Sequence, residues 1–174
     1  VVVNNSTASP TSGTSAITNL EIDSNTIYGG YANYLYGNGT ASNINFRNNI
    51  VDSTNYYGLY VQGINKFSLN NNKFTLNEFG NINGYGLYIN SCAAGIGFAH
   101  EIIGNNIVNA AYQGIYISSS AGQSATRSVL LNNSLGGGFR STNAYGIYFT
   151  GSSYNWNVFH NSVNFDAVTV NTQN

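Results

Sequence analysis

The 174-residue sequence predicts an all-β solenoid, a parallel β-helix of about six coils with little or no helix. The first support is an eight-residue phrase, apolar-x-apolar-x-x-Asn-x-apolar, that occurs six times. The second is a phrase Gly-apolar-Tyr-apolar that follows each of the four middle copies. The third is the alternation of apolar and polar residues inside each repeat, which is the periodicity of a strand and not of a helix.

The first phrase starts with residues 20–27 and predicts one bend in each coil. Strands stacked at a spacing of about 4.8 Å bring equal positions of successive coils over one another. Each repeated asparagine would lie at a bend that tolerates a left-handed backbone, with its amide bonded to the same group above and below. The sequence therefore predicts a structural ladder made of Asn25, Asn49, Asn72, Asn106, Asn133 and Asn161.

The second phrase, at 58–61, 86–89, 114–117 and 146–149, predicts another strand in each coil. Its apolar residues must face the core, so alternation turns the tyrosine between them outward. With Tyr36 in the same register, the predicted outward column is Tyr36, Tyr60, Tyr88, Tyr116 and Tyr148. Such a column either stabilises the sheet by cross-strand stacking or binds a sugar ring or a partner protein, so these five are candidate binding residues.

The rest of the chain divides simply. Residues 1–16 predict an N-terminal strand and linker, and residues 17–174 predict the β-helix itself. Three longer connections, at 75–84, 91–98 and 118–123, are rich in Gly, Ala, Ser or Asn, as surface loops are. Neither end shows an amphipathic capping helix, and an uncapped coil presents open strand edges. We therefore expect a segment of a longer chain, covered by neighbouring coils, or end-to-end self-association.

A leucine-rich repeat is the competing solenoid. Residues 17–27 and 64–74 fit its template residue for residue. The other four copies lack one or more of the template's apolar residues. Every repeat also holds a second strand-like segment where a leucine-rich repeat would usually place a helix. A coil with two or three strands is a parallel β-helix, which is therefore the favoured fold.

These Asn-rich turns resemble those of the right-handed parallel β-helix repeat proteins. Residues 143–148 and 157–163 are similar to phrases in long, repetitive, adhesin-like surface proteins of gliding and marine Bacteroidota. Those proteins usually leave the cell by the type nine secretion system. The resemblance covers nearly all of residues 17–170 and implies a right-handed coil that is secreted or at the cell surface. Its motifs specify coil geometry, and it carries no catalytic residues across.

Composition narrows the possible partners. Only 6% of the residues are charged, against about 25% in a typical soluble domain. A net charge of -1 offers no footprint for a nucleic acid, and no apolar run is long enough for a membrane span. The single cysteine, Cys92, predicts a buried small side chain. No metal-binding motif is present, so we expect no metal and no cofactor.

An enzyme of the pectate-lyase kind is built on this fold and needs converging acids, or a base beside a carboxylate cluster. The six acids of this chain scatter over the predicted coils. Asp23 and Arg47 occupy equal positions in adjacent coils and predict an exposed ion pair. His100 and His160 fit structural roles better than catalytic ones. A catalytic groove would have to gather at least two of Glu78, Glu101, His100 and Arg127.

The sequence thus favours a non-catalytic extracellular stalk, adhesin or filament element. We expect it to contact a glycan or a partner surface through the tyrosine column. A polysaccharide lyase or hydrolase, or the glycan-binding module of one, is the alternative.

Overall fold

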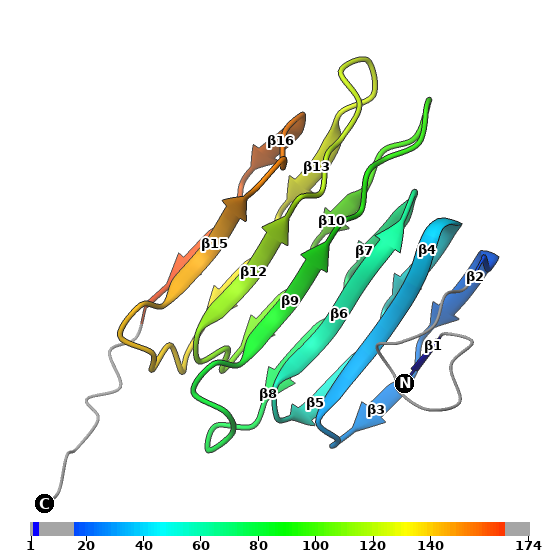
Figure 1. The fold of residues 1–174 in the computed structure, drawn as a ribbon. Coiled ribbons are helices and arrows are strands. Elements are labelled where there is room, and N and C mark those ends of the chain that lie inside the picture. The colour runs from blue at the N-terminus through cyan, green and yellow to red at the C-terminus, as the bar shows by residue number, and fades with distance from the viewer. Residues whose placement is uncertain (1, 4–15, 166–174) are drawn as a thin grey trace, which may run out of the picture.

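The computed structural model describes residues 2–3 and 16–165, and within this part the chain is all-β and contains no helix. It forms a parallel β-solenoid of about five turns, which confirms the predicted fold class. Six copies of the asparagine phrase delimit five turns, so the predicted count of about six is one too high. The coil is right-handed: in Figure 1 strands run upward in front, the chain returns downward behind, and each turn is displaced to the left.

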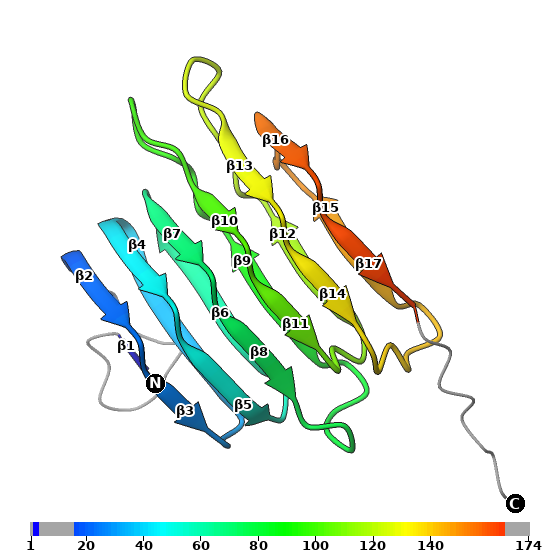
Figure 2. The same ribbon diagram turned by 180° about the vertical axis from the view of Figure 1, so that it is seen from behind.

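Each complete turn contributes one strand to each of three sheets of parallel strands, which we call A, B and C. Sheet A lies in front in Figure 1, and sheets B and C lie in front in Figure 2, so A covers one side of the core and B and C the other. The strand β4 (Ala32–Arg47) runs through both A and B and joins them into one 11-stranded sheet. Sheet C has six strands.

The strand bounds follow the repeats. Besides the first part of β4, sheet A contains β1 (Val2–Val3), β6 (Tyr57–Ile64), β9 (Tyr85–Asn90), β12 (Gln113–Ser118) and β15 (Tyr145–Thr150). Besides the second part of β4, sheet B contains β2 (Thr18–Asp23), β7 (Phe67–Asn70), β10 (Glu101–Ile103), β13 (Ser128–Leu131) and β16 (Trp156–Phe159). Sheet C contains β3 (Thr26–Tyr28), β5 (Ile50–Thr54), β8 (Lys73–Leu76), β11 (Asn106–Val108), β14 (Ser134–Gly136) and β17 (Ser162–Asn164).

The core consists of columns of like residues, because equal positions of successive turns pair in register. In sheet B, Phe46 pairs with Leu69, Leu69 with Ile102 and Ile102 with Leu130, and none of the four is exposed. Burying each such side chain stabilises the fold by about 1.5 to 3 kcal/mol. The alternation that suggested strands is therefore the alternation between this core and the outer surface.

A column of glycines explains why the second phrase begins with that residue. A Cβ on Gly86 would lie 2.5 Å from the carbonyl oxygen of Gly114 in the next turn and 2.3 Å from Cγ2 of Ile107. Gly58 and Gly114 are crowded in the same way, and a Cβ on Gly146 would lie 2.3 Å from Cγ1 of Val163. A side chain larger than hydrogen does not fit where sheet A approaches sheet C this closely.

The corner between sheets B and C, the ladder corner, has the same two-residue length in every turn. Its first residue takes a left-handed backbone, with φ between 51° and 68°, and the six residues are Ser24, Asn48, Asn71, Gly104, Asn132 and His160. The ladder asparagine is the second residue. The predicted bend with a left-handed backbone is therefore present, and the residue that adopts this conformation is the one before the ladder asparagine.

The termini are only partly described. Most of the predicted linker 1–16 and the end of the predicted β-helix, residues 166–174, lie outside the described residues. Residues Val2–Val3 form β1, which pairs in parallel with β4. The longer connections lie at the other two corners: between β9 and β10 and between β12 and β13 at one, and between β8 and β9 and between β14 and β15 at the other.

Candidate functional site

The asparagine ladder is present, and it runs through Asn105 where Asn106 was predicted. Each backbone N–H donates to the Oδ1 of the next rung at 2.9 to 3.0 Å, and each Nδ2 donates to the same oxygen. From the second rung on, each Nδ2 also donates to a carbonyl of the preceding turn at 2.7 to 2.9 Å. The rungs are Asn25, Asn49, Asn72, Asn105, Asn133 and Asn161.

The error at the fourth rung has a physical cause. Gly104 takes the left-handed position of the corner, so Asn105 follows it into the ladder and Asn106 begins β11 with its side chain exposed. The shift by one residue also moves His100 to a core position, because sheet B now pairs Ile102, and not Ile103, with Leu69. A glycine before the doublet was the signal that could have placed the rung.

The outer surface of sheet A carries the tyrosine column, with one residue changed. Tyr60, Tyr88, Tyr116 and Tyr148 pair in register, as predicted. The residue of β4 that pairs with Tyr60 is Tyr34, and Tyr36 pairs with Gln62. The register shifts in β4 between Ala32 and Tyr34, which places Tyr36 one step beyond the column. Alternation cannot separate these two tyrosines, because both face outward.

The column is part of a larger surface. Eleven tyrosine rings form one continuous set of contacts, with ring centroids 4.3 to 6.1 Å apart. We call this set the tyrosine face: Tyr31, Tyr34, Tyr56, Tyr57, Tyr60, Tyr85, Tyr88, Tyr112, Tyr116, Tyr145 and Tyr148. Ring packing of this kind contributes about 0.5 to 1.5 kcal/mol per pair beyond area burial. The face therefore stabilises sheet A whether or not it binds anything.

The tyrosine face is neither buried nor fully open. Tyr34 is 8% exposed, while Tyr31, Tyr145 and Tyr148 near the two ends are 56%, 44% and 37% exposed. The seven other rings are partly exposed. Mutual burial raises the pKa of Tyr88 to about 12, chiefly by desolvation. The Tyr88 phenol is therefore neutral over the physiological pH range, and the face is an aromatic surface with hydroxyl groups.

Amides border the tyrosine face on one side. The Tyr60 hydroxyl donates to Oε1 of Gln62, and Nε2 of Gln62 donates to the Tyr36 hydroxyl at 2.9 Å. Nδ2 of Asn90 donates to both the Tyr60 hydroxyl and Oε1 of Gln62 at 3.2 Å. The predicted Tyr36 thus belongs to this polar border, where it can exchange hydrogen bonds with a ligand on the face.

The residues that a catalytic groove would need are dispersed. His100 is fully buried, stacked on Phe67 with centroids 4.2 Å apart, and its Nε2 lies 2.8 Å from the Cys92 carbonyl oxygen. Desolvation lowers the pKa of His100 to about 4. Glu101 lies on the outer surface of sheet B and accepts hydrogen bonds from Ser68 and Asn70. Glu78 and Arg127 are exposed in separate loops.

Cys92 is buried, as its isolation in the sequence predicted, and belongs to a second, shorter ladder. Its backbone N–H donates to Oγ of Ser120 at 3.0 Å, and the N–H of Ser120 donates to Oγ of Ser153 at 3.1 Å. Burial raises the pKa of the Cys92 thiol to about 12. The thiol is protonated and has no access to a substrate, so its role is packing.

The ion pair between Asp23 and Arg47 is present and includes a third residue. Nε of Arg47 lies 3.1 Å from Oδ2 of Asp23 and 2.6 Å from Oε1 of Glu21. The pKa of Asp23 is lowered, first by the hydrogen bond from the Asn48 side chain and then by that from Ser24, with Arg47 adding a smaller effect. This solvated cluster holds the first two turns together and does not resemble a catalytic pair.

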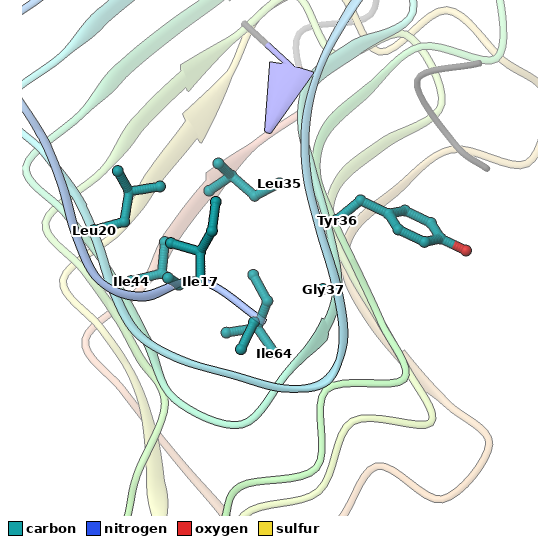
Figure 3. Close-up of a pocket in the computed structure, with 8 residues that line it drawn as sticks. Ile17, Leu20, Leu35, Tyr36, Gly37, Ile44 and Ile64 are labelled. Atoms are coloured by element: carbon teal, nitrogen blue, oxygen red, sulfur yellow. The ribbon is translucent and has the colours of Figure 1, made fainter. Parts of the chain in front are cut away.

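A small pocket lies at the N-terminal end of the core (Figure 3). Its lining is almost entirely apolar and comes from β2, the residue before it, β4 and β6: Ile17, Leu20, Leu35, Tyr36, Gly37, Ala41, Ile44 and Ile64. In Figure 3 the isoleucines and leucines converge on the pocket, whereas the ring of Tyr36 points away from it. Without polar groups that converge there, the pocket is the open end of the core and not a catalytic site.

Among residues 2–3 and 16–165, no group of three His, Cys, Asp or Glu side chains is placed to hold a metal ion. The same residues form no helix that is long and apolar enough to cross a bilayer. No protein-family model matches the chain, and no curated protein and no solved structure matches it either. The candidate site is therefore defined by the tyrosine face and its amide border alone.

Proposed function

We propose that the protein is a non-catalytic β-solenoid, secreted or at the cell surface, that binds a glycan through the tyrosine face. The observation that carries this proposal is the continuous set of eleven tyrosine rings on and beside sheet A, all of them at least partly exposed except Tyr34. Aromatic rings present apolar area at low entropic cost, and their hydroxyls keep one end of each ring in water. Sugars have the matching character, because apolar C–H patches lie beside hydroxyl groups on the same ring.

The border of the tyrosine face supports the same ligand. Gln62 and Asn90 carry amide groups at the edge of the rings, where they can donate to or accept from sugar hydroxyls. The face has no charged residue among its eleven members, which favours a neutral partner over an ionic one. The wide, flat form of a parallel sheet suits an extended chain better than a small molecule.

The resemblance to adhesin-like repeat proteins of Bacteroidota supports a surface or secreted location, with export by the type nine system. The low content of charged residues, 6%, together with the abundance of Asn, Ser, Thr, Gly and Tyr, favours the same location. We infer that the solenoid acts as a stalk that holds the tyrosine face away from its attachment point.

The test is retention on polysaccharide by affinity electrophoresis, with a neutral β-glucan and a uronic-acid polymer as separate probes. The double variant Tyr88→Ala/Tyr116→Ala removes two central rings and should lose at least about tenfold in affinity for a retained polymer. Tyr88→Phe/Tyr116→Phe keeps the rings and separates stacking from hydrogen bonding.

The matched control is Tyr28→Ala/Tyr154→Ala, which removes two tyrosines that are 78% and 59% exposed and lie outside the tyrosine face. This control should be retained like the unmodified protein. Equal loss in both double variants, or no retention of the unmodified protein by either polymer, would contradict the proposal. Release of new sugar ends during the assay would instead favour the enzymatic alternative.

A further inference from the structure

The asparagine ladder has a direction. Each rung from Asn25 to Asn133 donates its backbone N–H to Oδ1 of the next rung on its C-terminal side. Oδ1 of Asn161 therefore accepts from Asn133, while the backbone N–H of Asn161 donates to no acceptor among the described residues. At the other end, Oδ1 of Asn25 accepts from no donor in that same part of the chain. The ladder therefore ends with an acceptor, Oδ1 of Asn25, at the N-terminal end of the coil and with a donor, the N–H of Asn161, at the C-terminal end.

The apolar columns end in a matching way. Val158 and Val163 continue columns that are fully buried in the preceding turns, yet they are 46% and 37% exposed. At the opposite end, Ile22 and Ile27 begin the same two columns and are partly exposed. Each end of the coil thus exposes apolar residues of the core columns, and the residues at one end could cover those at the other.

We propose that a second copy of this chain docks head to tail on the first. The strands β2 and β3 of one copy pair in parallel with β16 and β17 of its neighbour, so that Asn25 lies over Asn161. The same register places Ile22 over Val158 and Ile27 over Val163, and the backbone N–H of Asn161 in one copy reaches Oδ1 of Asn25 in the next. Strand addition at an open edge uses this combination of backbone hydrogen bonds and side-chain columns.

The outer residues do not oppose this register. Glu21 would lie beside Asn157, and Asp23 beside Phe159, so no two like charges meet across the junction. Because the two surfaces differ, the contact is heterologous, and repeated addition builds a filament along the solenoid axis. A second copy fits better than an unrelated protein, since one chain carries both halves of the junction in the same register. This inference does not depend on the tyrosine face.

Sedimentation velocity of the 174-residue chain over a wide concentration range tests the association. The chain should form a series of oligomers whose size increases with concentration. Val163→Asp places a carboxylate in the junction and should shift the chain to monomer, and Ile27→Asp should do so from the other end. The control is Ile96→Asp in the loop between β9 and β10, a residue 94% exposed and far from both ends in sequence.

Circular dichroism must show strand content equal to the unmodified chain in each variant, so that loss of association is not loss of fold. A chain that stays monomeric at every concentration would overturn the proposal. So would undiminished association of folded Val163→Asp or Ile27→Asp, or equal loss in Ile96→Asp.

Cross-linking tests the polarity and does not disturb the core. Glu21→Cys and Asn157→Cys lie on the outer surface and would be neighbours across the junction, at a Cα separation of about 4.8 Å that a disulfide spans. With diamide as oxidant, a mixture of the two single variants should form mixed dimers, in which each thiol loses its proton and one electron to the oxidant. Each variant alone should stay uncross-linked, because Cys92 is buried. Homodimers of either variant alone would overturn the head-to-tail arrangement.

Discussion

At the residue scale, two adjacent residues at the ladder corner do different work. The first reverses the chain with a left-handed backbone, which Ser, Asn, Gly and His tolerate better than β-branched residues do. The second inserts its amide between two turns, where Oδ1 accepts two hydrogen bonds and Nδ2 donates two. A buried amide whose donors and acceptor are all hydrogen-bonded is stabilising, but the loss of one rung leaves its neighbours without partners.

The pair Asn105 and Asn106 gives a matched test of this division. Asn105→Ala removes the acceptor for Asn72 and the donor to the Leu69 carbonyl, so the free energy of unfolding should fall by about 2 to 4 kcal/mol. Asn106→Ala changes an exposed side chain one residue later and should change it by less than about 0.5 kcal/mol. Urea titrations followed by circular dichroism measure both. Equal losses in the two variants would show that Asn105 is not the rung.

His100 makes stability depend on pH. Its pKa falls from 6.5 to about 4 on folding, so the folded state favours the neutral ring. The contribution of His100 to the free energy of unfolding is present above the unfolded pKa and is lost as the pH falls from about 6.5 towards 4. The full difference corresponds to roughly 3 kcal/mol at 1.36 kcal/mol per pH unit. Its Nδ1 has no partner in the buried site, which agrees with a ring that donates through Nε2.

The measurement is the free energy of unfolding near pH 7 and near pH 4.5. His100→Phe should flatten the decrease between these two conditions, since phenylalanine keeps the stack on Phe67 but does not titrate. The control, His160→Asn, changes the other histidine to a residue that tolerates the same left-handed backbone and should keep the decrease. If the decrease in stability between the two pH values disappeared with His160→Asn, His160 and not His100 would be its cause.

Part of this residue-level detail could be predicted. Five of the six rungs follow from the repeated phrase, and the doublets at 48–49, 71–72 and 132–133 all place the second asparagine in the ladder. At 105–106 the first asparagine takes that place, because glycine already fills the left-handed position. The choice depends on backbone conformation, which a pattern of apolar residues does not encode.

At the element scale, the glycine column sets how closely sheets A and C approach. Each glycine of the column leaves room for an apolar residue of sheet C, and Gly58, Gly86 and Gly114 also leave room for the carbonyl of the next turn. This close approach fixes the inward direction of the apolar residues that follow and, with them, the outward direction of the tyrosines. The glycines therefore support the tyrosine face without being part of it.

Gly86→Ala should destabilise the protein by about 3 kcal/mol, because the new methyl group would overlap Ile107 and the Gly114 carbonyl. Gly136→Ala is the control: its Cβ would meet only Asn164, at 3.7 Å, and stability should be nearly unchanged. Thermal unfolding followed by circular dichroism compares the two. A Gly86→Ala variant as stable as Gly136→Ala would mean that the sheets adjust more easily than their spacing indicates.

The sheet-level pattern was predictable where the phrase was complete. Tyr60, Tyr88, Tyr116 and Tyr148 each follow the Gly-apolar pair and pair in register. In β4, the single residue Asn33 stands where later turns have glycine and an apolar residue, and the register shifts there. Tyr34 and Tyr36 both face outward, so only the hydrogen-bond register decides between them. Sequence alternation carries no information on that choice.

At the scale of the whole molecule, stability comes from columns and amides and hardly from charge. In the described part of the chain, the ion pairs between side chains are those of Arg47 with Glu21 and Asp23, on the exposed surface. We expect the midpoint of thermal unfolding to change by less than about 2 °C between low salt and roughly 0.5 M NaCl, since screening has little to act on. A larger decrease with salt would reveal a dependence on charge that the coil does not show.

The three corners of the coil differ in how much length they accept. The ladder corner keeps the same short connection in every turn, whereas the corners on either side of sheet A carry connections of several lengths. Added chain at those two corners leaves the stacking of rungs untouched. The solenoid therefore has one corner of constant length and two that accept insertions. Peptides grafted near residues 124–126 or 78–83 would extend single turns without altering the spacing of the turns.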